Sequence, residues 1–538
     1  MKKLPLAESA FTRIIEEGYV YVDKTKEIYE LINYSRYIFL SRPRRFGKSL
    51  LISTLEAMFQ GKKELFKGLW IEDKIEWKEY PVIRIDFGRI TYNDFESFEN
   101  QMAKLMNKYA RQHKVKLYSQ NYAAMMNDLI LEIYEKTGKE VVVLIDEYDA
   151  PIARNITNMK AAEDFQNSLR DFYSILKASN NELKFVFFTG ISKFAKMSIF
   201  SVVNLMKDVS LKPQFVNILG FTMEELKQYF GDYIRQFAAK EQTTETELLE
   251  EITTWYDGYS WDGKSRLFNP YSIVNVFQDQ KFNNYWFETG TPAILIKLIK
   301  EKYAIERETV PTMEEFENIE TAMLDSSYDL TTRIPLEKLL YETGYLTITN
   351  IFETEIGDLY TLNYPNSEVR QSFNAFILEV FSNQNVANIN YNAIKLRTAL
   401  QNQDKDGFLK ILRSLFSALP YQHRKQASEA YYHGLFYLVL SLLGIRSHLE
   451  GSTDKGRIDC TLEMDEMVYI IEFKYGEKGT MAYLLKQAMT QISSHKYFEP
   501  FEGMDKEVWL FAVGFLVKKD SKLGKPVLNI DGELKQHR

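Results

Sequence analysis

Residues 1–215 alternate short apolar runs with longer stretches in which apolar residues recur at helical spacing. Four of the apolar runs have the length of buried strands: RYIFLS, PVIRIDF, EVVVLIDEYD and KFVFFTG. Strands that helices cover on both faces lose the alternation of apolar and polar residues seen in half-exposed strands. The pattern therefore predicts an α/β fold in which βα units surround a parallel sheet.

The pattern changes twice further along the chain. Residues 216–420 are mainly helical, and IPLEKLLYETGYLTITN followed by DLYTLNYPN predicts a helix, a turn at Gly344 and a hairpin, as in a winged-helix element. From residue 421, the apolar helix YYHGLFYLVLSLLG precedes the strand-like runs RIDCTLEM, MVYIIEFKY and VWLFAVGFLV, which suits a small mixed α/β domain. We expect three domains, at 1–215, 216–420 and 421–538.

Composition narrows the class of protein. With 538 residues, 45% of them hydrophobic and 26% charged, the chain is too long for one core and too apolar to be disordered. Its net charge of −7 provides no global basic field, so contact with nucleic acid must come from local patches.

The same composition indicates the compartment. One cysteine, Cys460, excludes a disulfide framework and a thiolate zinc site, and it fits a reducing compartment. The N-terminal segment lacks the apolar region of a signal peptide, and the longest apolar stretch, at 435–445, is too short to span a bilayer. We expect a soluble cytoplasmic protein without membrane contact.

Four cations lie beside the glycine of SRPRRFGKSLL, directly after the first strand-like run. A P-loop needs a strand, a tight loop and Gly-Lys-Ser at a helix start. In that arrangement Gly47 lets backbone amides approach phosphate, Lys48 meets the β and γ phosphates, and the Ser49 hydroxyl ligates Mg²⁺. The usual G-x-x-x-x-G-K-S/T pattern has glycine where this chain has Arg42.

Other residues of the same loop complete the predicted nucleotide-binding segment. Arg44 and Arg45 can contact phosphate within the loop or act across a subunit interface as arginine fingers, and a solvated or structural role is the alternative. Phe46 and Leu50 flank the Gly-Lys-Ser core of the motif and are included in the predicted site.

A second polar feature follows the run VVVLIDE. A carboxylate at the carboxyl end of a buried strand is costly unless a metal or hydrogen-bond donors satisfy it. We therefore expect Asp146 to hold Mg²⁺ and Glu147 to orient and activate the attacking water. The alternative is a structural loop with an acidic strand cap.

A third strand ends in FFTGISKF. Thr189, Ser192 and Lys193 would reach the same edge of the sheet, where a polar group can sense the γ-phosphate, with Thr189 the first candidate. Ordinary turn chemistry around Gly190 explains these residues equally well.

A set of short sequence motifs occurs in a fixed order over nearly the whole chain: YVYVDKT, FLSRPRRFGKSLLISTLEAMF, LIDEYDAPI, FTGISKFAKMSIFS, WYDGYSW with NPYSI, YWFETGTP and YETGYLTI. The chain resembles the bacterial AAA-ATPase-like family, whose members often carry a C-terminal PD-(D/E)XK nuclease domain. By this resemblance, RPRRFGKS with arginine at position 42 is the family's own form of the loop. The resemblance also implies that Asp23 and Lys24 lie near the nucleotide; a salt-bridged N-terminal turn is the alternative.

The C-terminal segment GRIDCTLEMDEMVYIIEFKYG contains the parts of a metal-dependent phosphodiesterase. Asp459 ends one strand-like run, and Glu472 and Lys474 follow at positions i and i+2 of the next, so their side chains share a face. Two carboxylates bind one or two Mg²⁺ ions, and the lysine can position water or stabilise developing negative charge. The arrangement resembles the family's restriction-endonuclease-like module, with Ile458 in place of its proline. By itself, this pattern also fits a solvated strand face.

Further residues can complete this site. QAMTQISSHKYF follows at the place where related nucleases have a glutamine and tyrosine helix, which points to Gln491 as a catalytic residue with Tyr497 and, one turn earlier, Gln487. Additional candidates are Tyr432, His433 and Glu450.

Charge and aromatic content limit how nucleic acid can bind. Residues 451–480 contain four Lys or Arg against seven Asp or Glu, so this site needs metal before it can accept a polyanion. Basic groups of the tail can supply a phosphate track or belong to a solvated face: Lys518, Lys519, Lys522 and Lys525. We expect the aromatic residues of the middle region to pack in the core instead of stacking on bases: Trp255, Tyr256, Tyr259, Trp261, Tyr285 and Trp286.

These inferences favour an ATP-controlled nuclease. ATP and Mg²⁺ are the expected cofactors and nucleic acid the expected partner, DNA in preference to RNA; a homo-oligomer is compatible with the sequence. One alternative is an ATP-dependent switch or scaffold whose C-terminal domain binds nucleic acid or protein without cleaving it. Another is an NTPase whose C-terminal domain only assists assembly. The presence of Asp459, Glu472 and Lys474 together favours the enzyme.

Overall fold

The chain divides into two compact units in the computed structural model. The first unit comprises Met1–Leu295 and Phe316–Val369, and the second comprises Ile296–Glu315 and Arg370–Arg538. The described residues are 1–155, 158–193, 205–286, 293–305, 311, 314–322, 324, 335–382, 385–417, 429–443, 446–453, 456–464, 466–501, 503, 505–519 and 526–537. The domain bounds expected at residues 215 and 420 stay a prediction, since this division rests on internal contacts alone.

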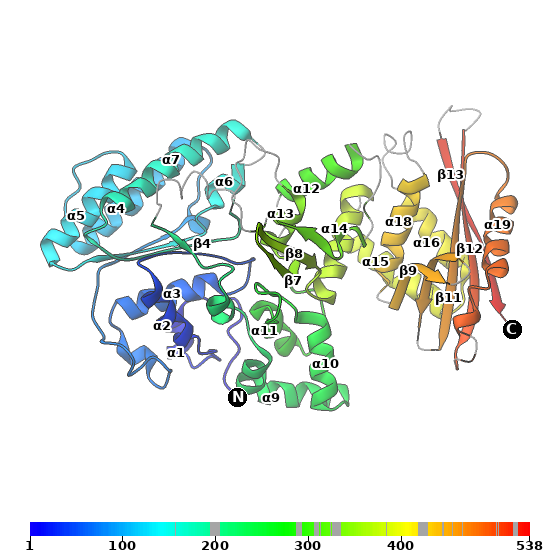
Figure 1. The fold of residues 1–538 in the computed structure, drawn as a ribbon, viewed down its shortest axis with the longest axis horizontal. Helices are drawn as coiled ribbons and strands as arrows, with labels where there is room; N and C mark the ends of the chain where they lie inside the picture. The colour runs from blue at the N-terminus through cyan, green and yellow to red at the C-terminus, as the bar shows by residue number, and fades with distance from the viewer. Residues whose placement is uncertain are drawn as a thin grey trace. The chain divides into compact units, whose positions relative to one another are not determined.

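A five-stranded parallel sheet forms the centre of the first unit, with the strand order β2-β3-β4-β1-β5 (Figure 1). Its strands are β1 (Tyr37–Ser41), β2 (Val82–Asp86), β3 (Val141–Asp146), β4 (Leu183–Gly190) and β5 (Lys207–Asp208). The first four lie at the four apolar runs, which confirms the predicted parallel sheet. β5 has only two residues and was not expected.

Helices cover both faces of this sheet (Figure 1). One face carries α1 (Phe11–Glu16), α2 (Thr25–Tyr34) and α3 (Lys48–Phe59), and the other carries α4 (Phe95–His113), α5 (Tyr122–Thr137) and α7 (Met159–Ala178). Because side chains alternate along a strand, Ile38 and Leu40 pack in the core with α1–α3. Phe39 points to the opposite face, where its ring lies 5.2 Å from that of Tyr148. Short helices α6 (Ala150–Asn155), η1 (Lys63–Phe66) and η2 (Phe87–Arg89) complete this part.

Three helices of the middle region pack in a separate core of the first unit. They are α9 (Met223–Glu241), α10 (Glu245–Tyr256) and α11 (Pro270–Asp279), preceded by the short helix η3 (Pro213–Ile218). Leu4, Val20 and Val22 of the N-terminal segment belong to the same core. Tyr256, Tyr259 and the other four aromatic residues named above are partly or fully buried, so the expectation that these aromatics pack is confirmed.

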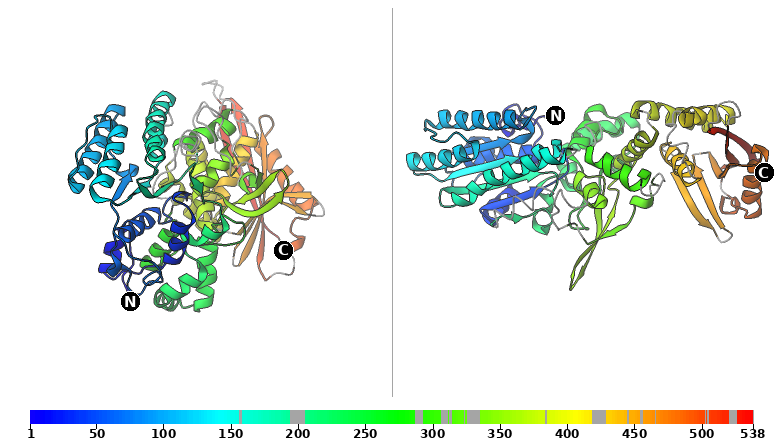
Figure 2. Two further views of the ribbon diagram at one scale, coloured as in Figure 1. Left: turned by 60° about the vertical axis from the view of Figure 1, so that its left-hand side comes forward. Right: turned by 90° about the horizontal axis from the view of Figure 1, so that it is seen from above.

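The predicted helix, turn and hairpin are present. α13 (Leu336–Thr343) ends at Gly344, whose φ of 90° is left-handed, and β7 (Thr347–Thr354) and β8 (Gly357–Asn363) follow. With β6 (Ile319–Thr321) they form a sheet of order β6-β8-β7. The far end of the hairpin extends into solvent (Figure 2), where Phe352 and Ile356 are exposed.

The second unit contains a five-stranded sheet of order β13-β12-β11-β10-β9. Its strands are β9 (Arg446–Thr453), β10 (Gly456–Glu463), β11 (Met467–Gly476), β12 (Glu507–Lys519) and β13 (Pro526–His537). Only β11 and β12 pair in parallel, which confirms the predicted mixed sheet. The sequence patterns did not reveal β9 or β13.

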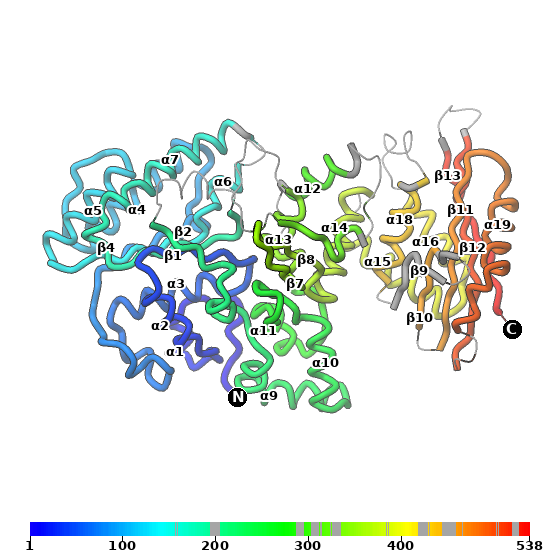
Figure 3. Tube along the Cα trace, viewed as in Figure 1, coloured from blue at the N-terminus to red at the C-terminus, as the bar shows by residue number. Residues whose placement is uncertain are grey.

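Helices lie on both faces of this second sheet as well (Figure 3). α19 (Met481–Ser494) packs against one face through Ala488 and Ile492, which share a cluster with Ile470 of β11. On the opposite face, α16 (Lys405–Ser417) and α18 (Glu429–Ser441) contact Phe515 of β12 through Phe416 and Phe436. The remaining helices are α12 (Ala293–Ile299), η5 (Lys300–Ile305), η6 (Glu314–Phe316), α14 (Ser367–Ser382) and α15 (Val386–Gln401). Throughout the described ranges, no helix combines the length and apolar character needed to cross a membrane.

Arg42, directly after β1, is a buried cation that ties the sheet to the following segment. Its guanidinium donates to the carbonyl oxygens of Ser41 at 2.9 Å, Ser210 at 2.8 Å and Phe215 at 3.2 Å. It also lies 4.0 Å from the ring centre of Trp261. Burial lowers the pKa of Arg42 to about 10. The arginine at the position usually occupied by the first P-loop glycine is therefore a structural anchor whose side chain is already bonded to the fold.

We expect Arg42→Met to destabilise the first unit by about 3 kcal/mol, because three carbonyl groups would lose a charged donor. The measurement is urea unfolding followed by tryptophan fluorescence. Arg44→Met, at an exposed position in the same loop, is the matched control and should change stability by less than about 0.5 kcal/mol. A loss below about 1 kcal/mol for Arg42→Met would mean that other donors satisfy the carbonyls.

Candidate functional sites

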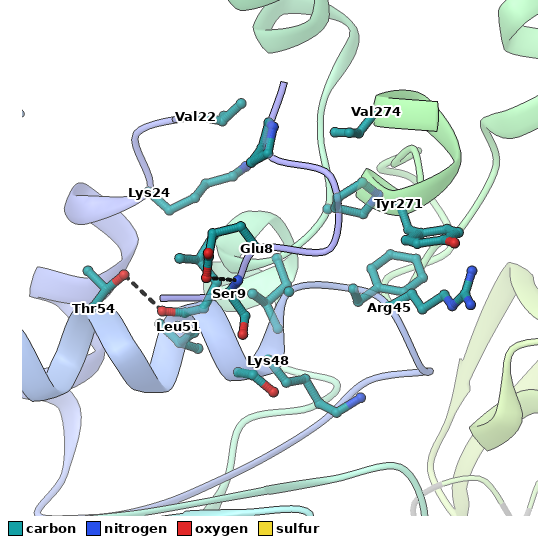
Figure 4. Close-up of a pocket in the computed structure, with 18 of the residues that line it drawn as sticks. Glu8, Ser9, Val22, Lys24, Arg45, Lys48, Leu51, Thr54, Tyr271 and Val274 are labelled. Atoms are coloured by element: carbon teal, nitrogen blue, oxygen red, sulfur yellow. Dashed lines mark hydrogen bonds between the residues drawn. The ribbon is translucent and has the colours of Figure 1, made fainter. Parts of the chain in front are cut away.

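A cavity of about 530 Å³ opens beside the Gly-Lys-Ser segment of the first unit. Its walls come from the N-terminal segment, the start of α3, the loop before α9 and the start of α11 (Figure 4). Arg44, Arg45, Phe46, Gly47, Lys48, Ser49, Leu50 and Glu147 all line it. The structure thus brings most of the predicted nucleotide-binding residues to one cavity.

The loop before α3 has the backbone conformation that exposes amide groups at a helix start. Gly47 precedes the first residue of α3 with φ 90°, and Arg45 also has a positive φ of 67°. A Cβ atom at Gly47 would lie 3.7 Å from Leu219, an ordinary contact, so the backbone conformation and not space favours glycine here. A helix start with this geometry is suited to binding an anion.

Lys48 is held under the loop and is only 7% exposed. Its Nζ donates to the carbonyl oxygens of Arg42 at 2.9 Å and Pro43 at 2.8 Å. Burial lowers the pKa of Lys48, and the nearby carboxylates of Glu147 and Asp146 oppose this shift. A bound phosphate would have to replace these carbonyl contacts.

Asp146 and Glu147 end β3 with different surroundings. Asp146 is fully buried; its Oδ1 accepts from the backbone N–H of Glu147 at 3.1 Å, while its Oδ2 has no hydrogen-bond partner. Burial raises the pKa of Glu147, and Lys48 opposes that shift. A buried carboxylate oxygen without a donor fits a Mg²⁺ site of which Asp146 and Ser49 are the candidate ligands.

The end of β2 adds two residues that the sequence patterns did not single out. Asp86 pairs with Asp146 in the β2–β3 register, and burial together with Asp146 raises its pKa although Arg89 lies 3.0 Å away. A Cβ atom at Gly88 would lie 2.1 Å from Oε2 of Glu147. Glycine at this position is therefore what leaves space for the Glu147 carboxylate. The available signal was a polar residue at the end of a second parallel strand.

The three polar residues after β4 have different environments. Thr189 is fully buried next to Leu40 of β1, and its Oγ1 has no hydrogen-bond partner. Ser192 donates to Asp149 through its backbone N–H at 2.9 Å and its hydroxyl at 2.7 Å. Lys193 forms an ion pair with Asp208 at 2.9 Å. Ser192 and Lys193 thus stabilise the local turn, and Thr189 is the group suited to sensing a ligand.

Side chains of the loop itself also differ. Arg44 is exposed, whereas the Arg45 guanidinium lies 3.5 Å from the ring centre of Tyr271 and donates to the carbonyl oxygen of Tyr285 at 3.0 Å. Phe46 is fully buried, with its ring 4.8 Å from that of Tyr259, so its side chain anchors the loop.

Of the two N-terminal candidates, Lys24 faces the cavity and Asp23 bonds to the backbone. Lys24 lines the cavity and forms an ion pair with Glu225 at 2.6 Å. Asp23 accepts from the backbone N–H groups of Thr25 and Trp70, at 2.9 and 2.7 Å. Both carboxylate oxygens of Asp23 therefore have backbone partners, and Asp23 shapes the turn that carries Lys24.

The second candidate site lies where β10 and β11 stop pairing. Their antiparallel ladder ends at Cys460 and Ile471, and the next residue on each strand is Asp459 and Glu472. Oδ2 of Asp459 accepts from the backbone N–H of Phe473 at 2.8 Å. The two predicted catalytic carboxylates are thus adjacent, on neighbouring strands.

Glu472 is the most buried of these acidic groups. It is fully buried; its Oε1 accepts from Nζ of Lys474 at 2.8 Å, and its Oε2 has no partner. Burial, together with the nearby Asp459, raises the pKa of Glu472 to about 7. The unpartnered oxygen beside a second carboxylate fits a divalent cation, although the described residues hold no cluster of three or more His, Cys, Asp or Glu.

The candidate residues on the helices around this site make few direct contacts with its two carboxylates. His433 Nε2 lies 3.9 Å from Oδ1 of Asp459. Gln491 donates to the Tyr497 hydroxyl at 3.4 Å and bonds to neither carboxylate, and Gln487 donates to Tyr483 at 3.0 Å.

The other candidates of this region are packed in the fold, are exposed, or have side chains outside the described residues. The ring of Tyr432 stacks on Tyr475 at 5.6 Å. Lys518 is exposed. The side chains of Glu450, Lys519, Lys522 and Lys525 lie outside the described residues.

Comparisons with known proteins cover both of the regions that contain these candidate sites. A family described as predicted AAA-ATPase matches residues 5–200, and the PD-(D/E)XK nuclease superfamily matches residues 427–523. An uncharacterized protein in the vnfD 5′ region of Azotobacter chroococcum mcd 1 is 33% identical over 527 residues, which cover 97% of each chain. The chain therefore belongs to the AAA-ATPase-like family and carries a C-terminal domain of the PD-(D/E)XK nuclease superfamily.

Proposed function

We propose that this protein binds and hydrolyses ATP with Mg²⁺ in its first unit and that its C-terminal domain cleaves nucleic acid, DNA in preference to RNA, in a Mg²⁺-dependent reaction. The observation that carries the proposal is a pair of buried carboxylate oxygens without donors, Oδ2 of Asp146 and Oε2 of Glu472. Each lies at a strand position where a lysine and a second carboxylate are close. Structural acids in a protein interior normally have hydrogen-bond partners.

In the nucleotide site, different residues bind the phosphates, orient the attacking water and hold the metal. The amides at the start of α3 and Lys48 bind the phosphates, and Glu147 orients the attacking water from the neighbouring strand end. The Thr189 hydroxyl can donate to the γ-phosphate or to that water. Mg²⁺ held by Ser49 and Asp146 would neutralise phosphate charge.

In the nuclease site, Asp459 and Glu472 would hold the metal, which supplies Lewis-acid stabilisation of the phosphate. Lys474 forms an ion pair with Glu472, and it can orient water or offset negative charge on the phosphate. Gln491, which donates to the Tyr497 hydroxyl, is the proposed further catalytic residue. The excess of acidic residues in this segment makes metal a condition for binding a polyanion. A cytoplasmic location and a homo-oligomer are compatible parts of the proposal.

Two substitutions test the nucleotide site. We expect Lys48→Ala to abolish detectable ATP binding, a loss of at least about 100-fold, because a charged contact to phosphate is removed. Glu147→Gln should leave the Kd within about threefold but lower turnover at least about 100-fold, because the water loses its base. Binding is measured with a fluorescent ATP analogue, and turnover by phosphate release. Lys63→Ala and Glu76→Gln, at exposed positions, are the controls. Retained hydrolysis in either site variant would contradict the assignment.

Gly88→Ala tests the space that Glu147 occupies. The added methyl would overlap the carboxylate, since a Cβ atom there would lie 2.1 Å from Oε2. We expect ATP turnover to fall about tenfold or more while the Kd for ATP changes less than about threefold, because Glu147 moves and the loop at Gly47 does not. Gly231→Ala, within α9, where the nearest atom to the added Cβ is a guanidinium nitrogen of Arg235 at 3.7 Å, is the control for glycine replacement. Normal turnover in Gly88→Ala would show that Glu147 acts from another position.

Asp459→Ala tests the nuclease site. Purified protein is incubated with single- and double-stranded DNA and RNA, with Mg²⁺ or Mn²⁺, and with or without ATP. We expect metal-dependent cleavage that EDTA abolishes and that Asp459→Ala lowers at least about 100-fold, because a metal ligand is lost. Asp406→Ala, whose side chain is 89% exposed, should cleave normally.

The same assay separates the alternatives. Nucleic-acid binding without cleavage by the unmodified protein would favour a switch or scaffold. ATP hydrolysis without binding of nucleic acid would favour an NTPase whose C-terminal domain assists assembly.

A further inference from the structure

Glu368 is a buried acid that belongs to neither proposed site. It lies in the first turn of α14 and is fully buried. Its Oε1 accepts from the backbone N–H of Trp286 at 2.8 Å, and its Oε2 accepts from the Ser272 hydroxyl at 2.8 Å. Burial raises the pKa of Glu368 to about 7, while these donors and Arg45 oppose the shift.

The two partners of Glu368 are the chain neighbours of the two groups that hold Arg45. Ser272 follows Tyr271, whose ring lies 3.5 Å from the Arg45 guanidinium. Trp286 follows Tyr285, whose carbonyl oxygen accepts from Arg45 at 3.0 Å. One carboxylate thus fixes both segments that position an arginine of the phosphate-binding loop.

This arrangement reaches the candidate nucleotide cavity directly. Arg45 and Tyr271 both line the cavity (Figure 4), and Arg45 has a left-handed backbone two residues before Gly47. A buried carboxylate is stable only while its donors stay in place, so movement of either segment would leave Glu368 underbonded. A change in the loop is therefore linked energetically to Glu368.

Glu368 is also the point at which α14 leaves the first unit. That unit ends at Val369, and the same helix continues to Ser382 in the second unit. The first turn of α14 is thus bonded to the surroundings of the phosphate-binding loop.

We propose that Glu368 is a positioning residue for Arg45 and that, through Ser272 and Trp286, nucleotide binding changes the stability of the backbone hydrogen bonds in α14. This inference rests on the proposed function, since it takes the cavity beside Gly47 to bind a nucleotide.

Hydrogen exchange with the full chain tests the link. Exchange of peptides covering residues 367–382 is measured with and without Mg²⁺ and a saturating non-hydrolysable ATP analogue. In the unmodified protein, we expect nucleotide to change the exchange rates at least threefold. Glu368→Gln keeps the shape of the side chain but presents an amide donor to one of its two donors, so we expect less than a third of that change. Glu353→Gln, on the exposed hairpin, should behave like the unmodified protein.

A merely structural role predicts a different result. Glu368→Gln would then lower the melting temperature but leave the nucleotide-dependent change in α14 intact, which would overturn the inference. Ser272→Ala removes one hydrogen bond to Glu368 with a smaller change of structure. It should also reduce the exchange response, and it serves as the test if Glu368→Gln does not fold.

A double-mutant cycle on nucleotide affinity tests whether Glu368 acts through Arg45. We expect Glu368→Gln to raise the Kd of the analogue about threefold to tenfold and Arg45→Ala to raise it at least as much. The double variant should then bind no more weakly than Arg45→Ala alone; additive losses would overturn the inference. Absence of nucleotide binding by the unmodified protein would overturn the proposed function and this inference together. Normal binding with unchanged exchange in α14 would overturn the inference alone.

Discussion

The parallel ladder that joins β3, β4 and β1 determines where the polar groups of the first unit can be. In this ladder Phe39 pairs with Phe188 and Leu40 with Thr189, and β3 pairs with the other side of β4. Parallel strands end at one edge of a sheet, so the loop after β1, the acids after β3 and Thr189 meet there. These three strands are buried along their length except at Lys184 near the start of β4, and the polar groups of the candidate site lie at the opposite edge.

The same edge explains why so many charges are buried without a partner of opposite sign in direct contact. Arg42 and Lys48 both donate to carbonyl oxygens, which satisfies their N–H groups but leaves their charge available to the surroundings. Asp146 and Glu147 lie close enough to Lys48 to oppose the effect of burial on its pKa. Such an arrangement is costly for an empty cavity, and the proposed nucleotide and Mg²⁺ would lower that cost by adding charges of both signs.

The candidate site of the second unit also combines buried or partly buried acids with a lysine, but with fewer residues. Glu472 and Lys474 are two positions apart on one strand, and their ion pair at 2.8 Å holds the lysine beside the carboxylates. Asp459 faces them because the antiparallel pairing of β10 and β11 stops one residue earlier. The lysine lowers the cost of burying the Glu472 carboxylate, whereas the neighbouring Asp459 raises it, and a bound cation would offset that repulsion.

Local pattern was sufficient for the features that depend on neighbours in the sequence. The apolar runs predicted β1 to β4, and the Gly-Lys-Ser motif placed Gly47 at the start of a helix. Features that depend on distant segments could not be read in this way. Arg42 is an anchor because Ser210 and Phe215 present carbonyl groups to it, and Gly88 matters because β2 lies beside β3. The contact between Gln491 and Tyr497, which were both expected in the nuclease site, likewise depends on how the segment after α19 folds back, and their role in that site stays a prediction.

The pairing of β12 with β13 has a practical meaning for protein production. β13 is hydrogen-bonded to β12 from Val508 to Lys519, and it forms one border of the mixed sheet. A shortened version that stops before Pro526 would leave a long, largely apolar strand with open amide and carbonyl groups. Unpaired edge strands of this kind form hydrogen bonds with strands of other chains, so shortened versions of this protein would tend to aggregate and precipitate on expression.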